Sequence, residues 1–224
     1  MKKICCIFGA GEESLLPPLP PREEIYVIAA DGGYPFACRA CGRPDISVGD
    51  FDSLGYIPTG EVLVFPRQKD DTDLGLAIRQ GLAAGCTDFR IFGALGGRLD
   101  HTLASLSLLA SLVSRSGCRA FLFGPGYTVT AVHAGKLHFP PGGRGTVSVF
   151  SHGGTAVGVT LSGLFYPLSE AMLPADTALG VSNEFLNETP AYISCREGTL
   201  LVVWQDRSGG ALPEVLPAED SPSA

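Results

Sequence analysis

Residues 25–33 read Ile-Tyr-Val-Ile-Ala-Ala-Asp-Gly-Gly, and this stretch decides the fold class. The mostly apolar run Ile25–Ala30 has the length of a strand that is buried on both faces. Asp31 follows at once, and the two glycines after it let the backbone approach a ligand closely. The stretch predicts a buried strand with a carboxylate at its C-terminal end, although an ordinary tight turn would explain the glycines equally well.

Similar strand patterns alternate with helical patterns on both sides of this stretch. The expected strands are Ile4–Phe8, Ile25–Ala30, Glu61–Phe65 and Phe89–Phe92, and the expected helices are Pro35–Cys41, Leu74–Ala84 and His101–Ser114. Alternation of this kind is typical of a mostly parallel sheet flanked by helices. It predicts an N-terminal α/β domain over residues 1–124.

The pattern changes after Arg119, where short apolar runs separated by Gly/Pro turns replace the helices. These runs are Ala120–Phe123, Thr128–Val132, Gly145–Phe150, Thr155–Leu161, Ala191–Cys195 and Thr199–Trp204. One of the expected turns is His152-Gly153-Gly154. The pattern predicts an antiparallel β-sandwich or barrel over residues 125–208, with the boundary near Gly124. Residues 209–224, rich in Ser, Gly, Pro and Glu, are expected to form a disordered tail.

Composition limits the function classes. The 224 residues are 45% hydrophobic and 17% charged, and 23 acidic residues against 16 Lys and Arg give a net charge of −7. An electrostatic nucleic-acid binder needs a basic surplus, and a membrane span needs roughly 18 consecutive apolar residues; the chain has neither. Of seven cysteines, only Cys38 and Cys41 form a CxxC, so a zinc ribbon is not expected. Free thiols in this number fit a cytoplasmic protein that handles a small molecule.

The segment Gly49-Asp50-Phe51-Asp52-Ser53 carries a pair of acids. In an extended backbone Asp50 and Asp52 point to the same side, because side chains alternate with a period of two. Paired carboxylates repel each other unless a cation or a proton lies between them, and such a pair suits Mg²⁺ carrying phosphate. The alternative is that Asp52 or Ser53 simply caps a helix.

A third acidic cluster, Lys69-Asp70-Asp71-Thr72-Asp73, precedes the expected helix Leu74–Ala84. Acids at a helix start could merely cap the helix and complement its dipole. Together with Asp50 and Asp52, however, they favour a shared metal site.

A fourth cluster, Gly93–His101, runs from a strand end into a helix. Glycines before a helix N-terminus form an anion site, and Arg98 adds a fork for phosphate. His101 could shuttle a proton, or it could only pack or cap. The four clusters together describe a cleft suited to a Mg²⁺–polyphosphate reaction, and they leave the acceptor open. The connector Glu12–Arg22 carries no recognisable chemistry.

Five motifs occur in the order seen in bacterial thiamine pyrophosphokinases, and the chain resembles that family over nearly its whole length. The motifs are Asp31-Gly32-Gly33, Gly49-Asp50-Phe51-Asp52-Ser53, Lys69-Asp70-x-Thr72-Asp73, Gly96-Gly97-Arg98-x-Asp100-His101 and Ser182-Asn183-Glu184. The resemblance implies an α/β catalytic domain followed by a thiamine-binding β-sandwich. It also implies a homodimer with active sites between one subunit's α/β domain and the partner's sandwich.

The implied reaction moves the diphosphoryl group of ATP to the hydroxyl of thiamine, with Mg²⁺, and releases AMP. By resemblance, the metal ligands are Asp50, Asp52 and Asp73. The catalytic residues are Asp73, Arg98, which neutralises charge on the transferred group, and Asp100, which orients or accepts the hydroxyl proton. ATP and its phosphates contact Asp31, Gly32, Gly33, Asp70, Thr72, Gly96, Gly97 and Arg98. Thiamine contacts Tyr166, Ser182 and Asn183.

Two points stay open at this stage. A cationic thiazolium favours an aromatic face, so Tyr166 or Trp204 could stack on it, and either could equally belong to the core. Gly75 stands where family members usually carry a glutamate.

The alternatives to a thiamine pyrophosphokinase are a pterin pyrophosphokinase on a related scaffold, a nucleotide-binding regulator without turnover, and a Mg²⁺ phosphohydrolase that needs no acceptor.

Overall fold

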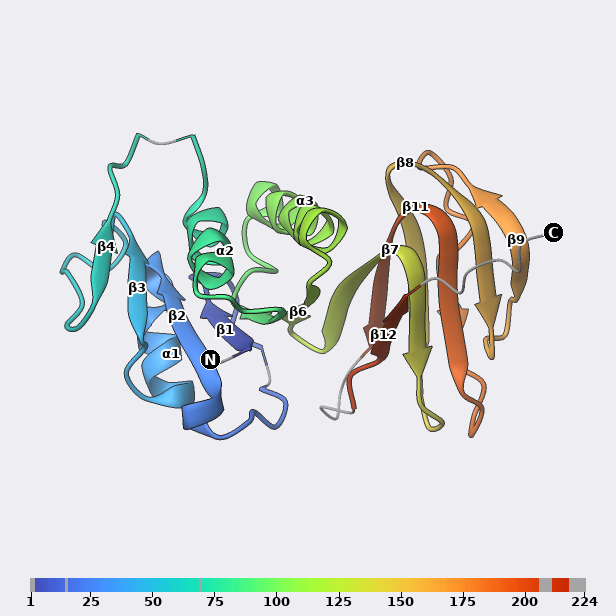
Figure 1. Ribbon diagram of the computed structural model, residues 1–224, viewed down its shortest axis with the longest axis horizontal. Helices are drawn as coiled ribbons and strands as arrows, with labels where there is room; N and C mark the ends of the chain where they lie inside the picture. Colours follow the sequence, from blue (N-terminus) through green and yellow to red (C-terminus); the bar gives the residue numbers. More distant parts are fainter. Residues whose placement is uncertain (1–2, 15, 69, 206–210, 218–224) are drawn as a thin grey trace.

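The computed structural model describes residues 3–14, 16–68, 70–205 and 211–217 (Figure 1). The strands are β1 (Ile4–Phe8), β2 (Ile25–Ala30), β3 (Ile46–Gly49), β4 (Val62–Val64), β5 (Asp88–Phe92), β6 (Arg119–Gly124), β7 (Tyr127–Phe139), β8 (Thr146–Ser162), β9 (Leu168–Leu173), β10 (Asn183–Glu184), β11 (Ala191–Gln205) and β12 (Glu214–Pro217). The helices are α1 (Tyr34–Cys41), α2 (Asp73–Ala83) and α3 (Leu99–Ser116), with 3₁₀ turns η1 (Arg22–Glu24) and η2 (Asp31–Gly33).

The first half of the chain is the expected mixture of parallel strands and helices. The strands lie in the order β4-β3-β2-β1-β5-β6, and every neighbouring pair is parallel. Alternate side chains enter different cores: Cys6 and Phe8 pack with α1, whereas Cys5 and Ile7 pack with α2 and α3. The apolar runs are continuous because both faces of these strands are covered.

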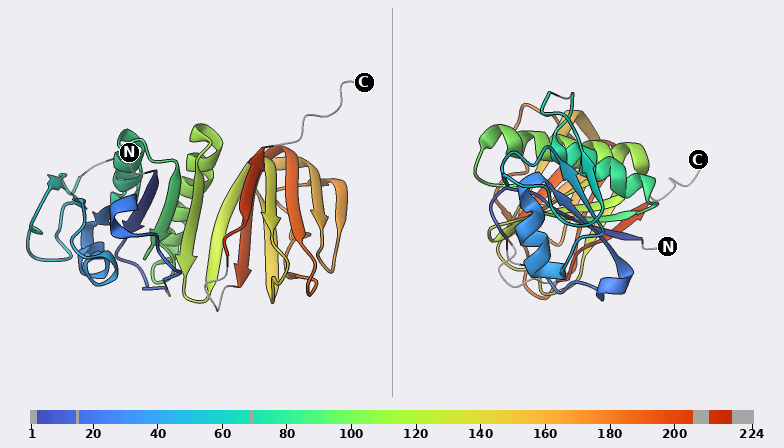
Figure 2. Two further views of the ribbon diagram at one scale, coloured as in Figure 1. Left: turned by 60° about the horizontal axis from the view of Figure 1, so that its bottom comes forward. Right: turned by 90° about the vertical axis from the view of Figure 1, so that its left-hand side faces the viewer.

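The second half is antiparallel and continues the same sheet. Strand β6 turns into β7 through a hairpin that pairs Gly124 with Tyr127, and β11, β8 and β10 follow in order. Figures 1 and 2 show the long strands β7, β11 and β8 side by side at the end of the molecule away from β4. The expected boundary near Gly124 therefore falls inside a hairpin of a continuous hydrogen-bonded sheet.

Two predictions about this half are wrong. His152-Gly153-Gly154 does not separate two strands, because β8 runs through it from Thr146 to Ser162. Similarly, the two runs expected between Ala191 and Trp204 are one strand, β11. In both strands the pairing register shifts at the glycines, which are Gly153 and Gly154 in β8 and Gly198 in β11. The glycines therefore lie in β-bulges rather than in the turns that the sequence indicates.

The expectation of a disordered tail over residues 209–224 is wrong for Glu214–Pro217, which form β12. This strand pairs with residues 135–138 of β7, and its Val215 packs against the core. The unpaired edge of β7 supplies hydrogen-bonding partners that composition does not reveal. Residues 206–210 and 218–224 of the tail lie outside the described residues.

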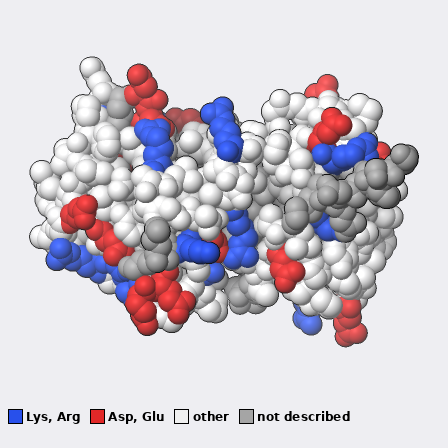
Figure 3. Space-filling model, viewed as in Figure 1, with Lys and Arg blue, Asp and Glu red and all other residues white. Residues whose placement is uncertain are grey.

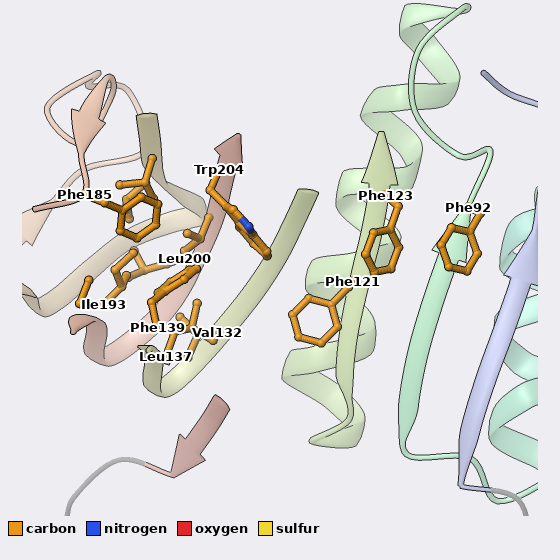
Figure 4. Close-up of a cluster of buried hydrophobic side chains, with 14 of the residues drawn as sticks. Phe92, Phe121, Phe123, Val132, Leu137, Phe139, Phe185, Ile193, Leu200 and Trp204 are labelled. Carbon is orange, nitrogen blue, oxygen red and sulfur yellow. The ribbon is translucent and has the colours of Figure 1, made fainter. Parts of the chain in front are cut away.

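An aromatic chain links the two halves (Figure 4). The ring of Phe92 stacks on that of Phe123 with a centroid distance of 4.7 Å, and Phe123 contacts Phe121. Phe121 in turn contacts Trp204, which contacts Phe139. Trp204 is only 7% exposed and meets two phenyl rings edge-on. It is therefore a core residue, which removes it as a candidate for stacking on a ligand.

Within the part of the chain that the structure describes, no helix is long and apolar enough to cross a membrane. On the face shown in Figure 3, the blue Lys and Arg side chains are interspersed with red Asp and Glu, and they form no continuous basic stripe there.

Candidate functional site

The ends of the parallel strands bring the four sequence clusters to one cavity of about 770 Å³. This is the place where open α/β sheets bind their ligands, since the loops after neighbouring strands meet there. Of the expected site residues, the lining includes Asp31, Asp50, Thr72, Asp73, Gly96, Gly97 and Arg98. It also includes His101.

Three carboxylates gather at this cavity. Asp31, Asp50 and Asp52 each offer an oxygen, and these oxygens all lie within 4.8 Å of one another. Ser53 Oγ donates to Asp31 Oδ2 at 2.5 Å, but Asp31 Oδ1 is buried and has no hydrogen-bond partner among the described residues. Buried acceptors are normally satisfied, and carboxylates this close repel each other, so the arrangement calls for a cation.

The close carboxylate group differs from the metal set predicted from sequence in two respects. The backbone at Asp50 and Asp52 is not extended, because Phe51 between them has a φ of 59°. In the described residues, the third member of the close carboxylate group is Asp31 rather than Asp73. The reason is topological: Asp31 and Asp50 follow the adjacent strands β2 and β3, whereas Asp73 opens α2 after β4.

Thr72 and Asp73 start α2 at the wall of the cavity. The hydroxyl of Thr72 accepts a hydrogen bond from the Gly75 amide at 3.1 Å, which caps the helix. Beside it, Asp71 Oδ1 accepts from the Thr72 amide at 2.7 Å, and Asp71 forms an ion pair with Arg79. A methyl group at Gly75 would overlap Asp71 Oδ1, so the carboxylate of Asp71 occupies the space over the glycine.

Arg98 lines the cavity and forms an ion pair with Asp100 at the start of α3. Arg98 Nε donates to Asp100 Oδ1 at 3.1 Å, and Arg98 Nη2 donates to Asp100 Oδ2 at 2.6 Å. The hydrogen bond from Arg98 lowers the pKa of the Asp100 carboxyl, and the same contact raises the pKa of the Arg98 guanidinium. A carboxyl whose pKa is lowered is a poorer proton acceptor, so the geometry favours Asp100 as an orienting group for Arg98.

Two residues that line the cavity, Glu12 and Arg67, were not predicted from the sequence. Glu12 Oε1 accepts from the Gly97 amide at 3.0 Å, so the connector expected to carry no chemistry in fact holds the glycine loop before Arg98. Arg67 lines the cavity and lies 3.6 Å from Asp52 Oδ2. The sequence pattern could have predicted Glu12, because Gly9-Ala10-Gly11-Glu12 places glycines and an acid directly after β1, as Asp31-Gly32-Gly33 does after β2.

The expected site residues of this half that are not in the lining are Gly32, Gly33, Asp52, Asp70 and Asp100. A methyl group at Gly33 would overlap the carbonyl oxygen of Phe8, so this glycine serves close packing against β1. Its neighbour Gly32 packs against Ala10 and Ser53. Asp70 is exposed, and Lys69 of the same motif lies outside the described residues.

The residues expected to bind thiamine lie in the antiparallel half, at or beside the edge strand β10, which β8, β11, β7 and β6 separate from β5. Tyr166 is 62% exposed and meets Phe165 edge-on at 5.0 Å. Ser182 is exposed with a φ of 58°, and its amide donates to Ser148 Oγ.

Asn183, by contrast, is 3% exposed. Its Oδ1 accepts from the amide of Tyr166 at 2.9 Å, and its Nδ2 donates to the carbonyl of Tyr166 at 2.7 Å. Both sides of the carboxamide therefore hold the Tyr166 backbone in place. The arrangement gives Asn183 a positioning role under an exposed aromatic pair.

Comparisons with known proteins agree on one family. The family model described as "Thiamin pyrophosphokinase, catalytic domain" matches residues 22–122, and "Thiamin pyrophosphokinase, vitamin B1 binding domain" matches residues 136–200. A thiamine pyrophosphokinase of Bacillus subtilis (strain 168) is 27% identical over an alignment of 220 residues, and the match covers 91% of this chain and 98% of that protein.

Solved structures agree in fold. The thiamine pyrophosphokinase structure from Bacillus subtilis aligns with a TM-score of 0.77 at 24% identity, covering 92% of this chain and 100% of that one. The structure from Geobacillus thermodenitrificans aligns with a TM-score of 0.75 at 25% identity, covering 92% of this chain and 98% of that one.

Proposed function

This chain belongs to the thiamin pyrophosphokinase family, and we propose that the cavity at the ends of β1, β2, β3 and β5 is its active site. The enzyme transfers the diphosphoryl group of ATP to the hydroxyl of thiamine and releases AMP. The oxygen of the hydroxyl forms a bond to the β-phosphorus, and the bond from that phosphorus to the oxygen bridging it to the α-phosphorus breaks. The hydroxyl proton goes to solvent or to a nearby carboxylate.

We infer that Asp31, Asp50 and Asp52 hold Mg²⁺. The observation that supports this is the close group of three carboxylates, in which the buried Asp31 Oδ1 has no hydrogen-bond partner in the part of the chain that the structure describes. Carboxylate oxygens are the ligands that Mg²⁺ takes in phosphate-transferring sites. When bound, the ion would neutralise negative charge on the phosphates.

Chain residues supply the remaining positioning. Arg98 would present its guanidinium to the transferred group, with Asp100 keeping the fork oriented. The Gly96-Gly97 loop, which Glu12 holds through the Gly97 amide, leads to the N-terminus of α3, where amides favour an anion. Phosphoryl transfer depends mainly on positioning and charge neutralisation, so the lowered pKa of Asp100 is no obstacle.

We propose that thiamine binds through the partner subunit of a homodimer. Phe165 and Tyr166 are exposed and hydrogen-bonded to β10, and Ser182 directly precedes that strand. Four strands lie between β10 and β5, so one chain does not bring these residues to its own cavity. A second copy that places these residues over the cavity would complete the site. Tyr166 offers an aromatic face to the thiazolium cation.

The same arrangement supports two functional units, 1–124 for ATP and 125–208 for thiamine and dimerisation. The change from parallel to antiparallel pairing at β6 and β7 marks their junction. Seven free cysteines favour a cytoplasmic location.

The decisive experiment measures AMP release from ATP and Mg²⁺ by chromatography, with thiamine, with a hydroxymethylpterin and with no acceptor. We expect AMP only with thiamine, in equal amount to thiamine diphosphate. AMP only with the pterin would move the substrate to the alternative acceptor. Phosphate released without any acceptor would indicate a phosphohydrolase, and ATP binding without AMP would indicate a regulator.

A further inference from the structure

A second cavity, of about 440 Å³, lies between the C-terminal half of α3 and the antiparallel strands, and we call it the α3–sheet groove. Four elements contribute polar side chains to it. The polar residues of its lining are Ser107, Ser111, Ser114 and Arg115 of α3, His133 of β7, His152 and Thr155 of β8, and Thr199 of β11. No residue of the groove lines the catalytic cavity.

The sheet side of the groove is set by the register. Thr199 pairs with His133 of β7 and also with His152 of β8, so the three residues form a row across neighbouring strands. Directly opposed residues of antiparallel strands share a face, and this face is the one under α3.

The sheet bulges beside this row in both pairings of β11, with β7 and with β8, and both bulges lie on the same side of the row. Residues 196–198 of β11 lie opposite the single residue Ala134, whose φ is 40°, and residues 153–156 of β8 lie opposite Gly198 alone. Bulges re-aim side chains and are frequent near functional sites. Two of them beside one row of polar side chains indicate a shaped binding surface.

The chemistry of the groove is that of an anion site. Among the described residues, its lining contains a guanidinium, two imidazoles and several hydroxyls but no carboxylate, although acidic residues outnumber basic ones in the chain. The side chains of His133 and Thr199 are joined by a 2.8 Å hydrogen bond at Nδ1, which fixes the ring and leaves Nε2 for a ligand. Arg115 forms no ion pair with the part of the chain that the structure describes.

A metal ion fits this lining poorly. Zinc takes four ligands, typically Cys, His or carboxylate, and the groove offers only two imidazoles. In the described residues, the close group of three or more potential ligands is the one at Asp31, Asp50 and Asp52. A tetrahedral oxyanion, in contrast, accepts hydrogen bonds from several directions, which matches donors converging from α3, β7, β8 and β11.

We propose that the α3–sheet groove binds the phosphate group of a small anion, either inorganic phosphate or a phosphate monoester. Arg115 supplies the charge, and His133, His152 and Thr199 surround the oxygens from the sheet. The cavity volume lies within the range of small-molecule sites. This inference stands apart from the reaction proposed above, because it uses none of the residues of the catalytic cavity.

The four histidines provide a test in a single nuclear magnetic resonance spectrum of the imidazole C–H groups. His133 and His152 report on the groove, His101 reports on the catalytic cavity, and His138, stacked on Tyr192 and paired with Glu214, serves as a reference. The full chain is titrated with inorganic phosphate in one arm and with glycerol 2-phosphate in the other.

We expect the His133 and His152 signals to shift together and to saturate with one dissociation constant in at least one arm, and the tighter arm identifies the source. Arg115→Gln should weaken this response by about 10-fold or more, because it removes a charge-assisted hydrogen bond. The His101 response should be unchanged. Arg144→Gln, the same change at an exposed arginine outside the groove, should leave all four titrations unchanged.

The proposal is overturned if the two groove signals move no more than the His138 signal in both arms, or shift without saturating. It is also overturned if Arg115→Gln titrates like the unmodified chain. Because Arg115 is exposed, its replacement should not prevent folding; His133→Gln provides a second variant in which the His152 signal should lose its saturable shift.

Discussion

At the scale of single residues, the carboxylate group at Asp31 makes a direct prediction about metal. Asp31→Asn removes one of three mutually repelling charges, so the metal-free protein should unfold at a higher temperature than the unmodified chain. The stabilisation that Mg²⁺ gives should be lost, because a ligand is missing. Turnover should fall by on the order of 100-fold or more, the usual effect of losing one electrostatic group.

Thermal unfolding with and without Mg²⁺, together with the AMP assay, measures these effects. Asp176→Asn is the matched control at an exposed acid outside the cavity, and it should behave like the unmodified chain. Equal stabilisation of Asp31→Asn and the unmodified chain by Mg²⁺ would remove Asp31 from the metal site.

A second prediction at the residue scale concerns Gly75. Replacing a helical glycine by alanine normally stabilises by up to about 1 kcal/mol. Here we expect Gly75→Ala to destabilise, because the added methyl group overlaps Asp71 Oδ1 and displaces a carboxylate that is paired with Arg79. Urea denaturation should show the midpoint of Gly75→Ala below that of the unmodified chain.

The double variant Asp71→Ser with Gly75→Ala tests this cause. It should be more stable than Gly75→Ala alone, because the overlapping carboxylate is gone and the gain in helix propensity remains. If Gly75→Ala alone is as stable as the unmodified chain, the carboxylate of Asp71 does not require the glycine.

At the scale of elements, β12 is expected to stabilise the antiparallel half. It pairs with β7 and packs Val215 against the core, so its removal exposes both a strand edge and apolar surface. A chain that ends after Gln205 should unfold several degrees below the full chain and aggregate more readily. A chain that ends after Pro217 keeps β12 and should match the full chain in a thermal unfolding experiment. Equal stability of the two shortened chains would contradict this role.

At the scale of the whole molecule, the site proposed between two copies predicts complementation. Asp50→Asn removes a proposed metal ligand from the cavity, and Tyr166→Ala removes the aromatic side chain proposed to contact thiamine. Each homodimer should therefore be inactive. Random mixing makes half of the dimers hybrid, and each hybrid has one intact site, so the activity should recover to about a quarter of that of the unmodified protein. The AMP assay on subunits refolded together measures this.

Asp50→Asn mixed with Asp31→Asn is the matched control, because both changes disable the same cavity and every site in the hybrid is damaged. It should recover no activity. An equal lack of recovery with Tyr166→Ala would indicate that thiamine does not bind across two subunits.

The sequence determined what depends on local order. The apolar runs Ile4–Phe8 and Ile25–Ala30 form strands at the expected residues, because their period and composition suit burial on two faces. The clusters after the strands predicted a cleft at the strand ends, because parallel strands bring those ends to one edge. The five motifs also identified the family, which the comparisons support.

Which distant residues meet depends on how the strands are ordered in the folded protein. Asp31 joins Asp50 and Asp52 because β2 lies beside β3, and Glu12 reaches Gly97 because β1 lies beside β5; strand order is not written in either segment. The continuous strand β8 and the pairing of β12 likewise depend on partners far along the chain. Local composition fixes what a segment prefers, whereas hydrogen bonds and packing between segments fix where its side chains point.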